Sequence, residues 1–133
     1  MFDVELIKSR LAKHNPQTLQ IPQKRQAAVA MLLAETPNGV EVLFIRRAEY
    51  EGDPWSGDVA FPGGGIEPQD DGPQQTAERE VHEEIGFLLS PEQCIGRLDD
   101  LSGAYLPIQV SCFIYLLQHK PLFKLNGEVV ETF

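Results

Sequence analysis

The sequence predicts a single α/β domain of the α+β type, in which a mixed β-sheet is flanked by helices. Residues 3–14 and 73–85 show the apolar spacing of amphipathic helices, and the remaining apolar runs have the length of buried strands. Turn-forming residues separate these elements, and strands interspersed with helices are typical of a sheet packed against helices. With 133 residues, 42% of them hydrophobic, the chain is long enough for one core. We therefore treat residues 1–133 as one domain.

The first helix is expected over residues 3–14, and Asn15-Pro16 ends it because proline cannot continue a helix. Its apolar positions are Val4, Leu6, Ile7 and Leu11. We assign residues 1–20 to this helix and the loop that follows it.

Apolar runs predict the strands. Residues 27–34 and 40–47 enclose a turn-forming segment and are expected to form a hairpin of two buried strands. Residues 48–57 contain Gly, Pro and Asp and are expected to form a loop, after which a short strand at 58–62 leads into three glycines. Further strands are expected within residues 93–101, 110–118 and 127–133.

The second helix is expected to begin at Pro73 and to end before Gly86. Proline is favoured at the first helical position and glycine just after the last one. At helical spacing, one stripe of this segment is apolar and is expected to face the core. Its members are Ala77, Val81 and Ile85.

Glu80, Glu83 and Glu84 share the helix face beside this apolar stripe. Like charges at this spacing repel one another, and no lysine lies on the same face. One interpretation is a solvated acidic face, as for most charge runs. The other is a metal site, because Mg²⁺ prefers oxygen ligands and the preceding Gly63-Gly64-Gly65 would let a backbone carbonyl approach the ion. The adjacent glycines favour the metal site.

The composition restricts the partners. A net charge of −9, from 20 acidic and 11 basic residues, disfavours a sequence-independent grip on nucleic acid, and an anionic ligand would need a bridging cation. The amino-terminal segment does not resemble a signal peptide, and no apolar run approaches the ~20 residues that span a bilayer. Cys94 and Cys112 show no metal-ligand spacing and are expected to be buried thiols. We expect a cytoplasmic protein that binds neither nucleic acid nor membrane.

The segment from Gly65 to Phe87 resembles the Nudix box. In that motif, Gly is followed after five residues by Glu and after seven more by Arg-Glu, an apolar residue, any residue, Glu-Glu, any residue, Gly and an apolar residue. Arg79-Glu80-Val81 and the segment from Glu83 to Phe87 match it, and Asp71 stands in place of the first Glu. The resemblance implies the Nudix α/β/α sandwich, with residues 61–87 as its catalytic loop and helix.

The resemblance also implies a reaction: hydrolysis of a diphosphate bond in a nucleoside diphosphate linked to another group, with Mg²⁺ or Mn²⁺ and water attacking phosphorus. By motif position, the metal ligands would be Glu80, Glu83, Glu84 and the backbone carbonyl of Gly64. Arg79, Glu80 and Glu83 would carry the catalysis.

Several roles within the motif stay open. Arg79 would orient the box carboxylates, while Gly65 and Asp71 would support the loop, with Asp70 competing for the position of Asp71. Glu83 is the first candidate for the general base. Two acids outside the box, Glu128 and Glu131, are further candidates, whereas His82 is expected to be a surface residue because it lies away from the acidic face.

Residues 42–64 partly resemble the corresponding segment of coenzyme A diphosphatases, in which an Arg-rich strand leads through a loop to "FPGG". The usual Arg-Ser after the strand is Arg47-Ala48 here, and Trp55-Ser56 replaces the His of that subgroup. Arg46 and Arg47 are candidates for contact with a substrate phosphate, or are strand-end surface charges. Trp55 is a candidate for stacking on a substrate base, or packs within its loop.

Two other functions remain open: a Nudix-fold module that senses a nucleotide without turnover, and a pyrophosphatase that removes damaged nucleoside triphosphates. The intact acids of the box favour an enzyme over a pure binder. The chain stops at Phe133 in an expected strand, where Nudix domains commonly continue into a helix. Either the domain is abbreviated or residues follow Phe133, and an abbreviated domain would leave sheet surface for a partner chain, such as a second copy in a homodimer.

Overall fold

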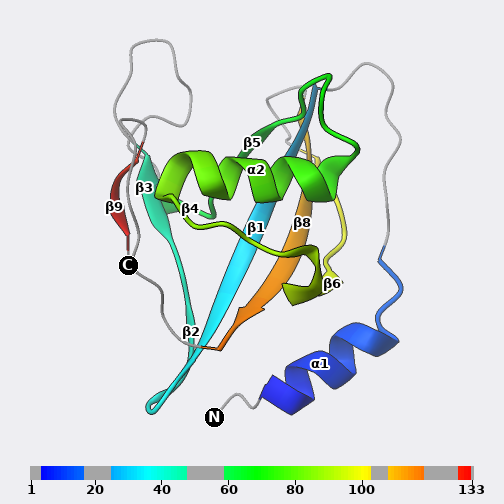
Figure 1. Cartoon of the computed structure of the whole chain (residues 1–133). Helices are drawn as coiled ribbons and strands as arrows, with labels where there is room; N and C mark the ends of the chain where they lie inside the picture. The colour runs from blue at the N-terminus through cyan, green and yellow to red at the C-terminus, as the bar shows by residue number, and fades with distance from the viewer. Residues whose placement is uncertain (1–3, 17–24, 48–58, 103–107, 119–128, 133) are drawn as a thin grey trace.

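The computed structural model describes residues 4–16, 25–47, 59–102, 108–118 and 129–132 (Figure 1). The helices are α1 (Val4–Lys13), α2 (Pro73–Ile85) and the short 3₁₀ helix η1 (Pro91–Gln93). The strands are β1 (Arg25–Thr36), β2 (Gly39–Val42), β3 (Ile45–Arg47), β4 (Val59–Ala60), β5 (Gly63–Gly65), β6 (Cys94–Arg97), β7 (Leu101–Ser102), β8 (Ile108–Leu117) and β9 (Val129–Thr132).

The two long strands β1 and β8 form the centre of the larger sheet, which has six strands. They run parallel, in a register that begins with Arg25 opposite Ile108 and ends with Ala34 opposite Leu117. Antiparallel partners extend the sheet on both sides: β2 and β5 pair with β1, and β6 and β7 pair with β8. The predicted mixed sheet is therefore confirmed, and a second sheet has the order β4-β3-β9.

The apolar run at residues 40–47 is not one strand, and the prediction of a single buried hairpin partner for β1 was wrong. β2 ends at Val42, and β3 begins at Ile45 and belongs to the smaller sheet. Val42 is 36% exposed, whereas Leu43 and Ile45 are buried. The chain passes from the larger sheet to the smaller one between Val42 and Ile45, and this crossing interrupts the apolar run.

The three glycines form a strand that the sequence did not predict. β5 pairs with β1, and Gly63 lies opposite Val29. A Cβ atom on Gly63 would lie 2.3 Å from the carbonyl oxygen of Ala28, so only glycine permits this approach of two backbones. The short strand also fixes the start of the loop that leads into α2.

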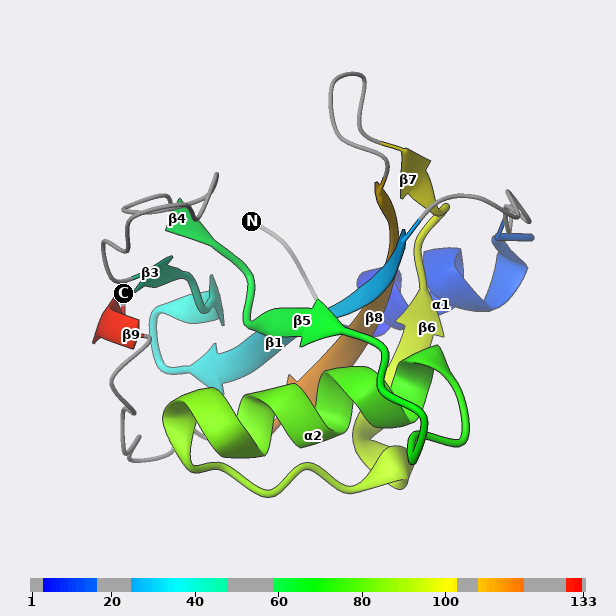
Figure 2. The ribbon, with the colours of Figure 1, turned by 90° about the horizontal axis from the view of Figure 1, so that it is seen from above.

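The helix α2 crosses one face of the larger sheet (Figure 2). Ala77, Val81 and Ile85 are each 0% exposed and belong to the hydrophobic core, which confirms the predicted stripe. The helix begins at Pro73, as predicted, and ends at Ile85. The next residue, Gly86, has a φ of 72°, in the left-handed region that favours glycine. Core positions contributed by β1 and β8 are Ala28, Ala30, Leu32, Ala34, Phe113, Tyr115 and Leu117.

The helix α1 packs against β6, where the side chain of Leu11 lies beside Gly96. The bounds predicted for this helix are confirmed to within a residue. Its apolar side is narrower than predicted, because Val4 is buried but Leu6 is 46% exposed. Within the described residues, no helix has the length and apolar character needed to cross a membrane.

We expect Gly63→Ala to lower the free energy of unfolding by about 2 kcal/mol, because the added methyl group overlaps backbone atoms of β1 that cannot move aside. Gly65→Ala is the matched control in the same strand, since its Cβ would meet nothing nearer than 3.6 Å. Urea denaturation followed by circular dichroism measures both. Equal stability of the two variants would contradict the close approach of β5 to β1.

Candidate active site

The acidic face of α2 lies against β5, and two of its three glutamates contact the glycines. The backbone amide of Gly63 donates a hydrogen bond of 2.7 Å to Oε1 of Glu84, which is 1% exposed. The carboxylate of Glu80 lies over Gly64, where an added Cβ would be 2.5 Å from the Glu80 Cδ atom. This part of the face is therefore not a solvated charge run.

Arg79 connects the carboxylates of the helix with the loop. Its Nη1 atom donates to Oε1 of Glu80 at 2.8 Å and to both carboxylate oxygens of Glu83 at 3.1 Å. Its Nη2 atom donates to the carbonyl oxygen of Gly65 at 3.1 Å, and only 16% of the side chain is exposed. Arg79 is therefore in contact with the carboxylates of both Glu80 and Glu83.

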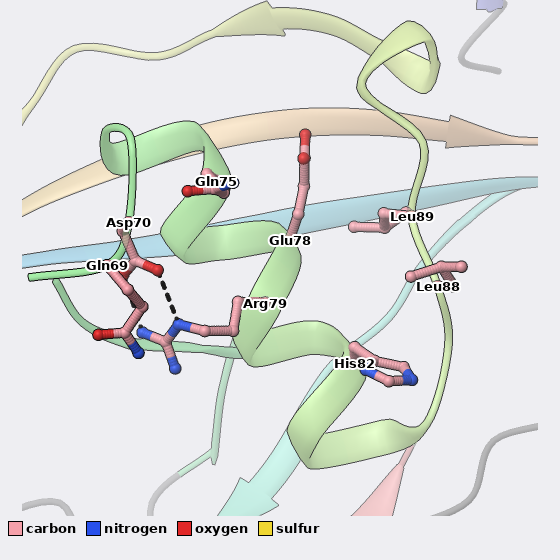
Figure 3. Close-up of a pocket in the computed structure, with 8 residues that line it drawn as sticks. All are labelled: Gln69, Asp70, Gln75, Glu78, Arg79, His82, Leu88 and Leu89. Atoms are coloured by element: carbon pink, nitrogen blue, oxygen red, sulfur yellow. Dashed lines mark hydrogen bonds and ion pairs between the residues drawn. The ribbon is translucent and has the colours of Figure 1, made fainter. Parts of the chain in front are cut away.

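Of the two adjacent loop acids left open for this position, Asp70 is the one whose carboxylate pairs with Arg79. Arg79 donates from Nε to Oδ1 of Asp70 at 2.9 Å and from Nη2 to Oδ2 at 3.1 Å (Figure 3). Asp71 is exposed, and its backbone amide donates to the side-chain oxygen of Gln75. The backbone between Gly65 and the helix turns Asp70 inward and Asp71 outward.

The surroundings of this pair stabilise its charged form. Hydrogen bonds from Arg79 hold the pKa of the Asp70 carboxyl well below its usual range, although burial opposes this shift. The backbone amide of Glu67 and the hydroxyl of Thr76 also donate to Asp70 and act in the same direction. In return, the pKa of the Arg79 guanidinium is raised, mainly by Asp70 and then by Glu83 and Glu80.

The three carboxylates predicted to bind the metal are near one another, but they do not converge on one common position for an ion. Glu80 and Glu83 converge on Nη1 of Arg79, and Glu84 is bonded to Gly63. In the part of the chain that the structure describes, no three His, Cys, Asp or Glu side chains are gathered as a metal site. The guanidinium of Arg79 occupies the position between two of the carboxylates.

The remaining predicted site residues lie on other elements or outside the described residues. Arg46 is exposed on β3, and Arg47 is in the same strand, with its side chain outside the described residues. Trp55 and Glu128 lie outside the described residues, and Glu131 is in β9, opposite Arg46, with an undescribed side chain. His82 is exposed, which confirms it as a surface residue.

A groove of about 310 Å³ lies along α2 beside the Asp70–Arg79 pair (Figure 3). Its lining residues are Gln69, Asp70, Gln75, Glu78, Arg79, His82, Leu88 and Leu89. Glu78 accepts a hydrogen bond of 2.7 Å from the hydroxyl of Tyr115, and burial together with this carboxylate raises the pKa of that tyrosine. Glu78 therefore satisfies the hydroxyl of a core tyrosine. No feature of the sequence predicted this pairing.

The sequence also did not predict a partly buried polar network that joins β6, the residues after it and β8. Nη2 of Arg97 donates to Oδ1 of Asp100 at 2.8 Å and to the hydroxyl of Ser111 at 3.1 Å. The guanidinium carbon of Arg97 lies 5.0 Å from the centre of the Phe113 ring. The network ties the segment after β6 to the central strand β8.

A model of the NUDIX domain family matches residues 24–131. An uncharacterised protein of Schizosaccharomyces pombe is 35% identical over 96 residues, which are 67% of this chain and 29% of that protein. An uncharacterised Nudix hydrolase of Pectobacterium atrosepticum, NudL, is 33% identical over 122 residues, which are 89% of this chain and 60% of that protein. The chain thus spans less than two thirds of the length of either relative.

Solved structures with a similar fold include the following two. A MutT/nudix family protein from Enterococcus faecalis has a TM-score of 0.72 at 18% identity, over 98% of this chain and 49% of that one. The NUDIX domain of Shewanella oneidensis NrtR, complexed with ADP ribose, has a TM-score of 0.67 at 19% identity, over 99% of this chain and 81% of that one. At these identities, the likeness establishes a shared fold.

We expect Asp70→Asn to lower the free energy of unfolding at pH 7 by about 3 kcal/mol, because it removes the ionised loop partner that makes two hydrogen bonds to the largely buried Arg79 guanidinium. The folded state lowers the pKa of Asp70, so the pair stabilises the fold fully above the unfolded pKa of about 4. This stabilisation is lost as the pH falls through the lowered pKa, so the difference between wild type and variant should narrow below about pH 4.

Urea denaturation of both proteins between pH 3 and pH 7 measures this difference. Asp71→Asn, at an exposed position, is the control and should match the wild type. A difference that stays constant over the whole pH range would exclude an ionised Asp70 as the origin of the effect.

Proposed function

Because the chain belongs to the NUDIX domain family, we propose that it hydrolyses a diphosphate bond in a nucleoside-diphosphate-linked substrate with the help of Mg²⁺ or Mn²⁺. The observation that carries this proposal is the contact of Glu80 and Glu84 with the glycines of β5. Two acids of the helix are held at the backbone, and Glu83 is held beside Glu80 by Arg79. Such an arrangement is typical of a site rather than of a solvated surface.

The donor chemistry of these residues suits a hard divalent cation. Glu80, Glu83, Glu84 and the backbone carbonyl of Gly64 would hold it, and all of these ligands are oxygens, which Mg²⁺ and Mn²⁺ prefer. The absence of a Cβ on Gly64 is what gives the Glu80 carboxylate its space at the strand. When bound, the ion supplies charge neutralisation for the diphosphate and lowers the pKa of a bound water.

Side chains of the protein position the carboxylates and supply the general base. Glu84 is fixed by the amide of Gly63, and Arg79 holds the carboxylates of Glu80 and Glu83 in place. Glu83 is 51% exposed, against 13% for Glu80, so it is the more accessible to water. This exposure supports Glu83 as the general base that accepts the proton of the attacking water at a carboxylate oxygen.

The substrate we propose is a nucleotide derivative, with coenzyme A as the first candidate. The partial resemblance of residues 42–64 to coenzyme A diphosphatases supports this choice, and the exposed Arg46 within that segment is a candidate phosphate contact. The related NrtR domain binds ADP ribose, which also contains a diphosphate. A single-domain organisation, cytoplasmic location and a homodimeric state remain predictions.

We expect Glu83→Gln and Glu84→Gln each to lower kcat by at least about 100-fold, because each removes a negative ligand oxygen from the metal site. Glu78→Gln is the control on the same helix, since this residue contacts Tyr115 on the groove side. Steady-state kinetics with saturating Mg²⁺ measures the three variants. Full activity of Glu83→Gln or Glu84→Gln would disprove the role of that residue as a ligand.

A panel of substrates tests the reaction itself. It should contain coenzyme A, ADP ribose and nucleoside triphosphates, each with Mg²⁺ and with Mn²⁺. We expect metal-dependent release of a nucleoside monophosphate or a phosphopantetheine product from a diphosphate-linked compound. Nucleotide binding without turnover of any compound would favour a sensing module, and turnover of triphosphates alone would favour a house-cleaning pyrophosphatase.

A further inference from the structure

We infer that Asp70, and not the neighbouring Asp71, is the residue that positions Arg79 between Glu80 and Glu83 for metal binding. This inference rests on the proposed function of the same site. Asp71 occupies the position of the first Glu of the box, and Asp70 is the residue immediately before it. The role is one of positioning, because Asp70 acts through Arg79.

Asp70 is itself held rigidly. Its side chain is 2% exposed, and its Oδ2 atom accepts hydrogen bonds from the Thr76 hydroxyl at 2.8 Å and from the Glu67 amide at 3.0 Å. Thr76 lies in the first turn of α2 and is completely buried, whereas Glu67 lies in the loop. Asp70 thus joins the loop to the start of the helix and cannot turn away from Arg79 without breaking these bonds.

The contact between Asp70 and Arg79 sets the orientation of the guanidinium plane. Two parallel hydrogen bonds, of 2.9 and 3.1 Å, use the edge formed by Nε and Nη2. This leaves Nη1 directed at Glu80 and Glu83. The position of the one nitrogen that bridges the two carboxylates therefore depends on Asp70.

Neither of the other acids in this loop provides the same contact. Asp71 is exposed, and its backbone is bonded to Gln75. Oε1 of Glu67 lies 3.8 Å from Nη1 of Arg79, beyond hydrogen-bond distance, and that side chain is 50% exposed. Among the described residues of the loop, the two-bond contact belongs to Asp70.

Asp70 affects how Arg79 and a metal ion compete for the same carboxylates. Arg79 and a divalent metal would both be attracted to the carboxylates of Glu80 and Glu83. The negative charge of Asp70 balances that of Arg79 and holds the guanidinium on the loop side. With a neutral residue at position 70, Arg79 would be held mainly by the two glutamates, and a metal would have to displace it. Removal of Asp70 should therefore weaken metal binding although every ligand is intact.

The test measures Mn²⁺ binding to the full chain without substrate, by isothermal titration calorimetry and by the electron paramagnetic resonance signal of free Mn²⁺. We expect Asp70→Asn to raise the Kd for Mn²⁺ about 10-fold, as for partners that orient metal ligands, and Asp71→Asn to change it less than about 2-fold. Wild-type affinity in Asp70→Asn, or an equal loss in Asp71→Asn, would overturn the inference. So would a wild-type chain that binds no Mn²⁺.

A second variant keeps the test valid if Asp70→Asn does not fold. Thr76→Val retains the shape and burial of the side chain but removes one hydrogen bond from Asp70. It should raise the Kd in the same direction by a smaller factor, and an unchanged Kd would count against the inference. Because no substrate is used, the expected Mn²⁺ pattern in a chain that hydrolyses nothing would contradict the proposed function while supporting the role of Asp70.

Discussion

The arrangement of this molecule's acidic site depends on one guanidinium group. Arg79 is the cation that allows Glu80 and Glu83 to lie close together on a helix of a protein with a net charge of −9. It also reaches the carbonyl of Gly65 and the carboxylate of Asp70, so it connects β5, the following loop and α2. A lysine could not make these contacts simultaneously, because it lacks the planar set of donors.

The hydrophobic core also constrains the acidic site, because it fixes the orientation of α2. Ala77, Val81 and Ile85 fix the rotation of α2 on the sheet, and this rotation decides which face of the helix meets the glycines. Glu84 lies at the border between the two faces and is buried, with its carboxylate at the Gly63 amide. The packing of apolar residues therefore determines how the charged residues meet the strand.

The second helix and its acidic face could be predicted from the sequence because their signals are local. Pro73 and Gly86 mark the ends of the helix, and the period of its apolar residues identifies the buried stripe. The division of residues 40–47 between two sheets could not be predicted, because β3 pairs with β9, a strand far away in the chain. The choice between Asp70 and Asp71 likewise depends on the backbone path of a loop.

The glycine strand links the chemistry of the site to the cooperativity of the fold. β5 pairs with β1, and β1 also pairs with β8 through the centre of the sheet. Because the amide of Gly63 positions Glu84, the acidic site rests directly on the strands at the centre of the larger sheet. The geometry of these acids should therefore persist through local fluctuations of the surface loops and disappear only when the sheet itself opens, with hydrogen-exchange protection close to that of global unfolding.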